Sequence, residues 1–140
     1  MTPEQTERIG RELAVLAGGG QRALLLSAGP PTTRDCVIYY AVPTGGACYS
    51  LPIETDVLVP VPSGYPAVTL DLAGLPAGSA LLPRVVGGPN CQGTLTADGR
   101  QWSLASYHPH GNGGGPPWNP MEHGFHTYFD YLLTWVTRIL

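Results

Sequence analysis

Glycine and proline divide this chain into short apolar runs, and their spacing constrains its fold more than any other feature. Nineteen glycines and fifteen prolines make up about a quarter of the 140 residues. They stand between strongly apolar segments rather than in one low-complexity stretch, so they mark turns. Short strands joined by turns are therefore predicted for the middle of the chain. Longer helical patterns occur only near its two ends.

Both ends carry helix signals. Thr2, Pro3 and Gln5 form a capping box with proline at the first helical position, which predicts a helix from Pro3 to Leu16. Near the other end, Asn119 and Pro120 are typical of a helix start, and a helix is expected over residues 120–140. Its apolar face recurs at helical spacing, at Phe125, Phe129, Leu132, Val136 and Ile139.

Between these helices, five runs have strand-like composition: residues 22–27, 36–42, 47–51, 56–61 and 66–72. Pro60 and Pro62 place the fourth run at a sheet edge or a strand end. Residues 73–118 lack clear periodicity and are predicted to be a long irregular active-site segment. The order predicts one α+β domain over residues 1–140, with an N-terminal helix, a four-stranded antiparallel meander and a C-terminal helix.

Composition excludes several classes of function. The net charge of −3 provides no basic stripe, so a nucleic-acid partner is not expected. No apolar run approaches the ~18 residues of a membrane span, and the polar first residues lack a signal-peptide core. Three cysteines without a C-x-x-C spacing indicate no disulfide framework and a reducing, cytoplasmic location.

Four short motifs follow one another along the chain: S-G-Y-P at 63–66, G-P-N at 88–90, G-T-L-T at 93–96 and W-N-P at 118–120. Their order and spacing resemble the ubiquitin-conjugating (E2, UBC) superfamily. Within it, the chain is most similar to small bacterial E2-like proteins of the prokaryotic E2 family E type. These share a G-Y-P element followed by an aspartate, here Asp71, and a G-R-x-W…S-x-H run, here Gly99 to His108.

The resemblance implies a UBC-like fold and an acyl carrier. Such a transferase would accept the activated C-terminus of a ubiquitin-like protein from an E1-like adenylating enzyme and pass it to a protein target. It would need no cofactor of its own, since ATP belongs to the E1-like partner. The family's thioester-forming cysteine is replaced by Thr96, so the carried species would be an oxyester.

A threonine hydroxyl needs a base, and His108 or His110 is a candidate for that role. The family's His-Pro-Asn is Gly88-Pro89-Asn90 here, and the retained Asn90 would support the loop and stabilise the oxyanion. Cys91 is the best thiol candidate, although it lies five residues before Thr96.

Two other interpretations remain open. A catalytically inactive E2 variant would bind the ubiquitin-like protein or scaffold the E1-like enzyme, and the missing cysteine favours it. A zinc site could be built from the four histidines, His108, His110, His123 and His126. Their spacing matches no standard zinc module, so no bound metal is expected.

Overall fold

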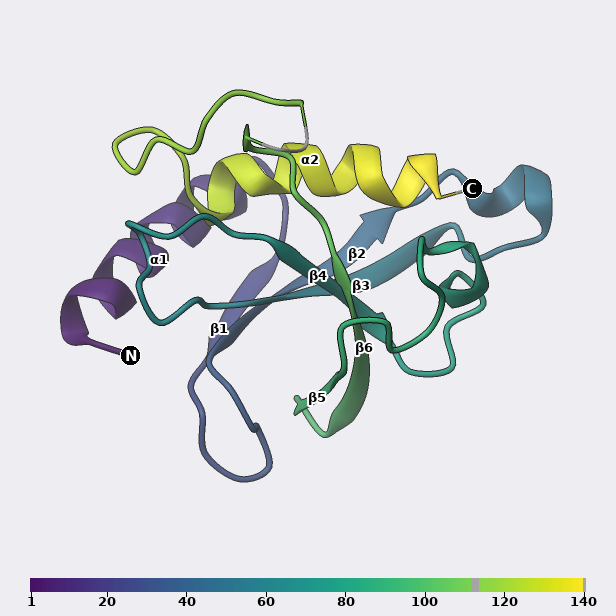
Figure 1. Cartoon of the computed structure of the whole chain (residues 1–140), viewed down its shortest axis with the longest axis horizontal. Coiled ribbons are helices and arrows are strands. Elements are labelled where there is room, and N and C mark those ends of the chain that lie inside the picture. Colours follow the sequence, from purple (N-terminus) through teal and green to yellow (C-terminus); the bar gives the residue numbers. More distant parts are fainter. Residues whose placement is uncertain (112–113, 140) are drawn as a thin grey trace.

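The computed structural model describes residues 1–111 and 114–139. Two α-helices stand at the ends of the chain, α1 (Pro3–Gly18) and α2 (Phe125–Arg138) (Figure 1). Between them are two short 3-10 helices, η1 (Gly46–Tyr49) and η2 (Leu82–Arg84). The strands are β1 (Ala23–Leu26), β2 (Cys36–Pro43), β3 (Glu54–Pro60), β4 (Leu72–Pro76), β5 (Thr94–Ala97) and β6 (Arg100–Ser106).

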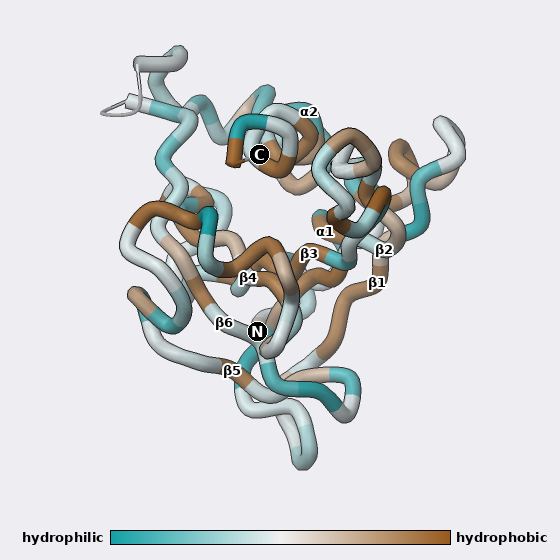
Figure 2. Tube along the Cα trace, turned by 90° about the vertical axis from the view of Figure 1, so that its right-hand side faces the viewer, coloured by the Kyte–Doolittle hydropathy of each residue, from teal (hydrophilic) through white to brown (hydrophobic). Residues whose placement is uncertain are grey.

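These strands form one antiparallel sheet in the order β1-β2-β3-β4-β6-β5. The first four make a meander, β6 pairs with β4, and β5 lies at the far edge. Both helices cover the same side of the sheet (Figures 1 and 2). The predicted α+β architecture, with a helix at each end and an antiparallel sheet between them, is confirmed. None of the helices in the described residues is long and apolar enough to span a membrane.

Alternation along the strands creates two apolar cores. In β2, Val37 and Tyr39 face the helices and join the main core, whereas Cys36 and Ile38 point to the opposite face. Figure 2 shows apolar segments of the sheet lying beneath α1 and α2. The burial of Cys36 raises the pKa of its thiol to about 12, so this cysteine is a core residue, as its place in an apolar run predicts.

The second core is closed by the β5–β6 hairpin. Leu95, Trp102 and Leu104 pack with the outward-facing residues of β2 and β3. The edge of β5 also meets the loop before β2, where the Thr33 N–H donates to the Thr96 carbonyl at 2.9 Å. The sheet therefore curls until β5 approaches the start of β2.

Several predicted strands lie elsewhere. Residues 47–51 are not a strand, because left-handed Gly45 and Ser50 bound the 3-10 helix η1 there. β3 is central rather than at a sheet edge, and it ends at Pro60, so of the two predicted places the strand end is confirmed. Residues 66–71 form a turn and irregular chain rather than a strand, and the fourth strand runs over Leu72–Pro76. The segment 73–118 is not irregular throughout, since β4, η2, β5 and β6 lie within it.

The two helix starts differ from each other in how well the sequence predicts them. The Thr2 hydroxyl accepts from the Gln5 N–H at 3.1 Å, and the Gln5 side chain accepts from the Thr2 N–H at 2.8 Å, so the capping box is confirmed. Helix α2, by contrast, begins at Phe125 with Gly124 as its N-cap. The Asn119 side chain accepts from the Met121 N–H at 3.0 Å and closes a separate turn. The last predicted helical residue, 140, lies outside the described residues.

Candidate functional site

The loop between η2 and β5, residues 85–93, carries Asn90 and Cys91. Left-handed backbone shapes it: φ is +88° at Gly87, +60° at Asn90 and +91° at Gly93. Glycine adopts this conformation freely and asparagine tolerates it better than most residues. A Cβ at Gly87 would lie 2.9 Å from the Cβ of Cys91, so glycine also leaves the space into which the Cys91 side chain folds.

Backbone bonds hold this loop against β6. The Asn90 N–H donates to the hydroxyl of buried Ser103 at 2.6 Å, and the Gln92 N–H donates to the Leu104 carbonyl at 3.0 Å. The Asn90 carbonyl in turn accepts from the Gly93 N–H at 3.0 Å. Asn90 therefore supports the loop through its backbone, and the residue as a whole is exposed.

Cys91 is exposed on this loop and forms no disulfide with Cys36 or Cys48. Its sulfur lies 3.5 Å from the Val86 carbonyl oxygen and 3.7 Å from the Leu104 carbonyl oxygen. The thiol thus donates weakly to the backbone and stays within reach of a partner from solvent. These contacts orient the thiol toward backbone acceptors, and neither is a cation or a base that would activate it.

A pocket of about 460 Å³ lies beside the Cys91 loop, between that loop, the end of β6 and the last turn of α2. Val86 connects the Cys91 loop with the pocket, because its carbonyl oxygen contacts the Cys91 sulfur and the residue also lines the pocket. Tyr107 and Trp135 form an aromatic wall, with ring centroids 5.8 Å apart. The Tyr107 hydroxyl donates to the Tyr131 carbonyl at 2.9 Å, which fixes the ring against α2.

The charged residues that line this pocket are cationic. They are Arg84 and Arg138, and none of the described lining residues is acidic; the exposed His108 also lines the pocket. The Arg84 guanidinium also lies 5.5 Å from the centre of the Tyr49 ring. Burial raises the pKa of the Tyr107 phenol, and the nearby charge of Arg138 acts in the opposite direction. The site is therefore apolar within and positively charged at its margin.

Thr96 lies in a different environment. It is half-buried in β5 opposite Gln101, and its N–H and carbonyl both bond to Thr33. From Gln101 to Ser106, β6 extends roughly 17 Å at ~3.3 Å per residue, and His108 follows beyond that end. The structure does not bring Thr96 and His108 together. It places His108 at the end of β6 that lies near the Cys91 loop.

His110 also lies away from Thr96. It is 5% exposed and packs against Tyr131 of α2, with ring centroids 5.1 Å apart. Its Nδ1 is 2.9 Å from the Pro116 carbonyl oxygen, and its Nε2 has no hydrogen-bond partner in the described part of the chain. Burial lowers the pKa of this imidazole. His110 is thus held neutral within an aromatic cluster that includes Trp118 and His123.

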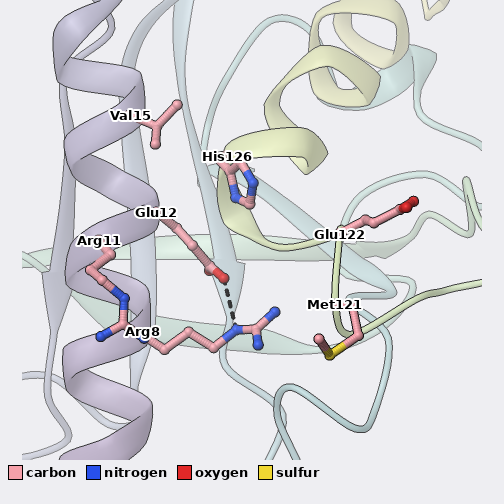
Figure 3. Close-up of a pocket in the computed structure, with 7 residues that line it drawn as sticks. All are labelled: Arg8, Arg11, Glu12, Val15, Met121, Glu122 and His126. Atoms are coloured by element: carbon pink, nitrogen blue, oxygen red, sulfur yellow. Dashed lines mark hydrogen bonds and ion pairs between the residues drawn. The ribbon is translucent and has the colours of Figure 1, made fainter.

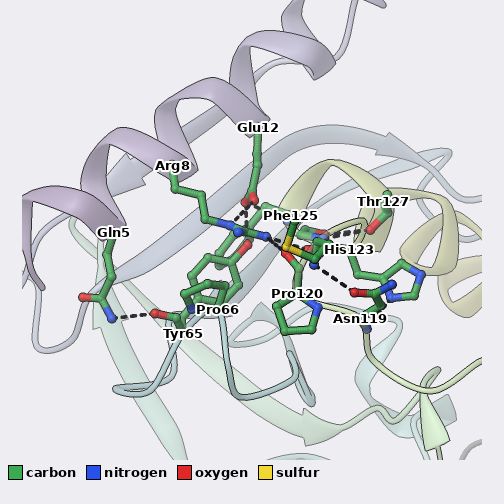
Figure 4. Close-up of polar contacts among 12 residues, drawn as sticks. Gln5, Arg8, Glu12, Tyr65, Pro66, Asn119, Pro120, His123, Phe125 and Thr127 are labelled. Atoms are coloured by element: carbon green, nitrogen blue, oxygen red, sulfur yellow. Dashed lines mark hydrogen bonds and ion pairs between the residues drawn. The ribbon is translucent and has the colours of Figure 1, made fainter.

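A buried polar network on α1 is not predicted by the motifs. Glu12 is only 6% exposed, and its carboxylate accepts from Arg8 at 2.9 Å, from the Phe125 N–H at 3.1 Å and from the Tyr65 hydroxyl (Figure 4). Arg8 also donates to the Pro120 and His123 carbonyls. The network fixes the W-N-P segment and the start of α2 to α1. The sequence signal is a carboxylate in line with buried Ile9 and Leu16.

A second, more polar pocket of about 270 Å³ opens on the outer side of this network (Figure 3). Arg8 and Glu12 on its α1 wall are already paired, and His126 faces them from the start of α2. Across the described residues, no group of three or more histidine, cysteine, aspartate or glutamate side chains is arranged to hold a metal ion. This pocket lies where α1 meets the segment that leads into α2.

Comparisons of the chain with protein-family models, with curated proteins and with solved structures find no match. The resemblance to E2 proteins therefore rests on the four motifs and their order. The candidate site rests on the geometry around Cys91.

Proposed function

We propose that this chain is an E2-like carrier of a bacterial ubiquitin-like conjugation pathway. It accepts the activated C-terminus of a ubiquitin-like protein from an E1-like enzyme and transfers it to an amine of a protein target. The observation that carries the proposal is the position of Cys91. Its thiol is exposed on a glycine-shaped loop directly after Gly88-Pro89-Asn90, beside a pocket large enough to receive part of a substrate.

Cys91 is a better carrier than Thr96 on the present geometry. A thiol ionises more readily than a hydroxyl and its thioester stays reactive toward amines. Thr96 is half-buried, its backbone is fixed to Thr33, and it lies at the opposite end of β6 from His108. The carried species is therefore a thioester on Cys91, and an oxyester on Thr96 is the competing outcome.

The proposed chemistry has two acyl transfers. In the first, the Cys91 thiolate attacks the thioester carbonyl of the E1-bound ubiquitin-like protein, and the E1 thiolate leaves as the new C–S bond forms. In the second, a target amine attacks the Cys91 thioester, the C–S bond breaks, and the amine proton passes to His108 or to solvent. The side-chain amide of Asn90, an exposed residue next to Cys91, would donate to the oxyanion that develops in each step.

The direct test is adduct formation with an E1-like enzyme and a ubiquitin-like protein, which would be sought among the genes that neighbour this one. With ATP present, we expect an adduct that is lost in excess thiol and absent from Cys91→Ala. Cys48→Ala is the matched control, since Cys48 is the other exposed cysteine. A thiol-resistant adduct that Thr96→Ala abolishes would move the acyl group to Thr96 and overturn the choice of nucleophile.

One observation favours the second candidate function, a catalytically inactive E2 variant that binds the ubiquitin-like protein or scaffolds the E1-like enzyme. The polar contacts of the Cys91 thiol are two backbone carbonyls, and neither promotes its ionisation. Under this alternative, the ubiquitin-like protein binds with a measurable Kd by calorimetry while no covalent adduct forms with ATP and the E1-like enzyme. That combination of results would replace the carrier proposal.

A further inference from the structure

The pocket beside Cys91 has a charge opposite to that of the whole molecule. The chain carries ten acidic and seven basic residues and a net charge of −3. Yet Arg84 and Arg138 line this one pocket, and no acidic side chain does so among the described residues. A pocket with cationic margins and an apolar interior matches a ligand that combines an apolar group with an anionic one.

The pocket lining also includes an exposed apolar side chain, Val86, which is 91% exposed. Tyr49, which is 55% exposed, is not a lining residue but contacts Arg84, which is one. Single exposed apolar residues are ordinary, but Val86 stands at a concave and largely apolar surface. The fold itself accounts for Trp135, which is buried in the main core, and for Arg138, which complements the dipole at the end of α2. Val86, in contrast, is exposed and belongs to neither core cluster of the described residues.

We propose that this pocket docks the acceptor protein, by binding a segment in which an apolar side chain lies next to a carboxylate side chain near the modified amine. The inference rests on the proposed carrier function, because it assigns the acceptor to the pocket beside the carrier thiol. The apolar side chain lies against Val86 and Trp135, and the carboxylate pairs with Arg138. Docking there brings the amine to the Cys91 loop.

Charge distinguishes the acceptor segment from the C-terminal tail of the ubiquitin-like protein, which also reaches this site. The tail of the ubiquitin-like protein loses its terminal carboxylate when it becomes a thioester, so this group cannot pair with the arginines. An acidic side chain of the acceptor keeps its charge through the reaction. Because Arg138 is exposed, its pairing is screened by salt and acts mainly on selectivity.

The test uses four fluorescein-labelled octapeptides, each built around one lysine, and fluorescence polarisation with the full chain. The first peptide carries leucine and glutamate beside the lysine. In the others, glutamine replaces glutamate, lysine replaces glutamate, or glycine replaces leucine. We expect the first to bind most tightly, with each replacement weakening binding about tenfold at low salt. Equal binding of all four peptides would overturn the inference.

A charge-reversal variant separates recognition from folding. Arg138→Glu should weaken binding of the glutamate peptide and strengthen binding of the peptide in which lysine replaces glutamate. A misfolded protein cannot produce this inversion of preference. Val86→Asp should weaken binding of the peptide that carries leucine. Arg34→Glu is the matched control, because Arg34 is an exposed arginine in the loop before β2. Unchanged peptide preference in Arg138→Glu contradicts the inference. A second result would also contradict it: the chain binds phosphatidylserine vesicles, Arg138→Glu abolishes that binding, and no peptide is preferred.

The peptide assay does not depend on the thiol, so the two proposals fail separately. Cys91→Ser should bind the first peptide as the wild type does. Peptide selectivity without any E1-dependent adduct would reject the carrier function and keep the docking site. An E1-dependent adduct on Cys91 without peptide selectivity would keep the carrier and reject the docking site.

Discussion

At the scale of single residues, Glu12 is a buried charged side chain at the junction of α1 with the start of α2. It is buried with three donors directed at its carboxylate. Glu12→Ala leaves the Arg8 guanidinium, the Tyr65 hydroxyl and the Phe125 N–H without their acceptor, which should cost about 3 kcal/mol in urea unfolding. Glu7→Ala is the control, because the Glu7–Arg11 pair is exposed and should contribute about 0–1 kcal/mol. Equal losses in the two variants would contradict this role.

His110 should make stability depend on pH. Burial lowers its pKa in the folded state, the Pro116 carbonyl opposes that effect, and His123 adds to it. The unfolded chain therefore binds a proton before the folded one, so the stability contribution is complete above the unfolded pKa of about 6.5 and is lost as pH falls through the lowered folded value. We expect His110→Gln to reduce the loss of unfolding free energy between pH 7 and pH 5. A pH dependence that stays as in the wild type after His110→Gln would contradict this role.

At the scale of elements, the β5–β6 hairpin depends on a two-residue turn. Asp98 and Gly99 both adopt left-handed backbone, with φ of +54° and +67°, as a type I′ turn requires. Gly99→Ala should therefore destabilise the fold by about 1–2 kcal/mol. Gly10→Ala is the opposite control, since Gly10 lies on the exposed side of α1 with open space at its Cβ, and alanine there should stabilise by about 0.5–1 kcal/mol. Thermal melts of both variants give the comparison, and a shift of the same sign in both would contradict it.

Comparison of these elements shows which features the sequence predicts. The Thr2 capping box is a local pattern and predicts α1 directly. The start of α2 is not local, because an acceptor for the Phe125 N–H comes from Glu12, more than a hundred residues earlier. Asp-Gly is a dipeptide that favours two-residue hairpin turns, but residues 73–118 were predicted to be irregular and this hairpin was missed. The second core, which this hairpin closes, also contains residues of β2 and β3. Local patterns predict those two strands, but they do not predict that the hairpin packs against them.

The candidate site likewise has some features that local motifs predict and others that depend on the fold. Cys91, Asn90 and His108 can be selected from motifs, since each lies in or near one. The pocket cannot, because Arg84, Tyr107 and Arg138 come from η2, the end of β6 and α2. Neither can the separation of Thr96 from His108, since it follows from strand register.

At the scale of the whole molecule, α2 links two regions and is anchored separately in each. Its first residues are fixed to α1 by Glu12 and Arg8, and its last turns form a wall of the pocket through Trp135. In the second half of α2, the Tyr107 hydroxyl donates to the Tyr131 carbonyl, beside the side chains that this half buries in the main core. The two anchors of α2 are therefore the contacts of Glu12 and Arg8 at its start and the Tyr107 bond in its second half, and no side chain takes part in both.

Removing one anchor should therefore leave the other intact. In Glu12→Gln, which keeps a neutral acceptor but loses the charge that pairs with Arg8, we expect faster amide hydrogen exchange at Phe125 and across residues 119–124. Exchange over residues 131–138 and polarisation-measured binding of the leucine–glutamate peptide should stay as in the wild type. Tyr107→Phe should produce the reverse pattern, since it removes the hydroxyl that holds Tyr131. If Glu12→Gln speeds exchange along all of α2 and weakens the peptide, the helix transmits changes from α1 to the pocket, and the region around Glu12 becomes a control point for the site at Cys91.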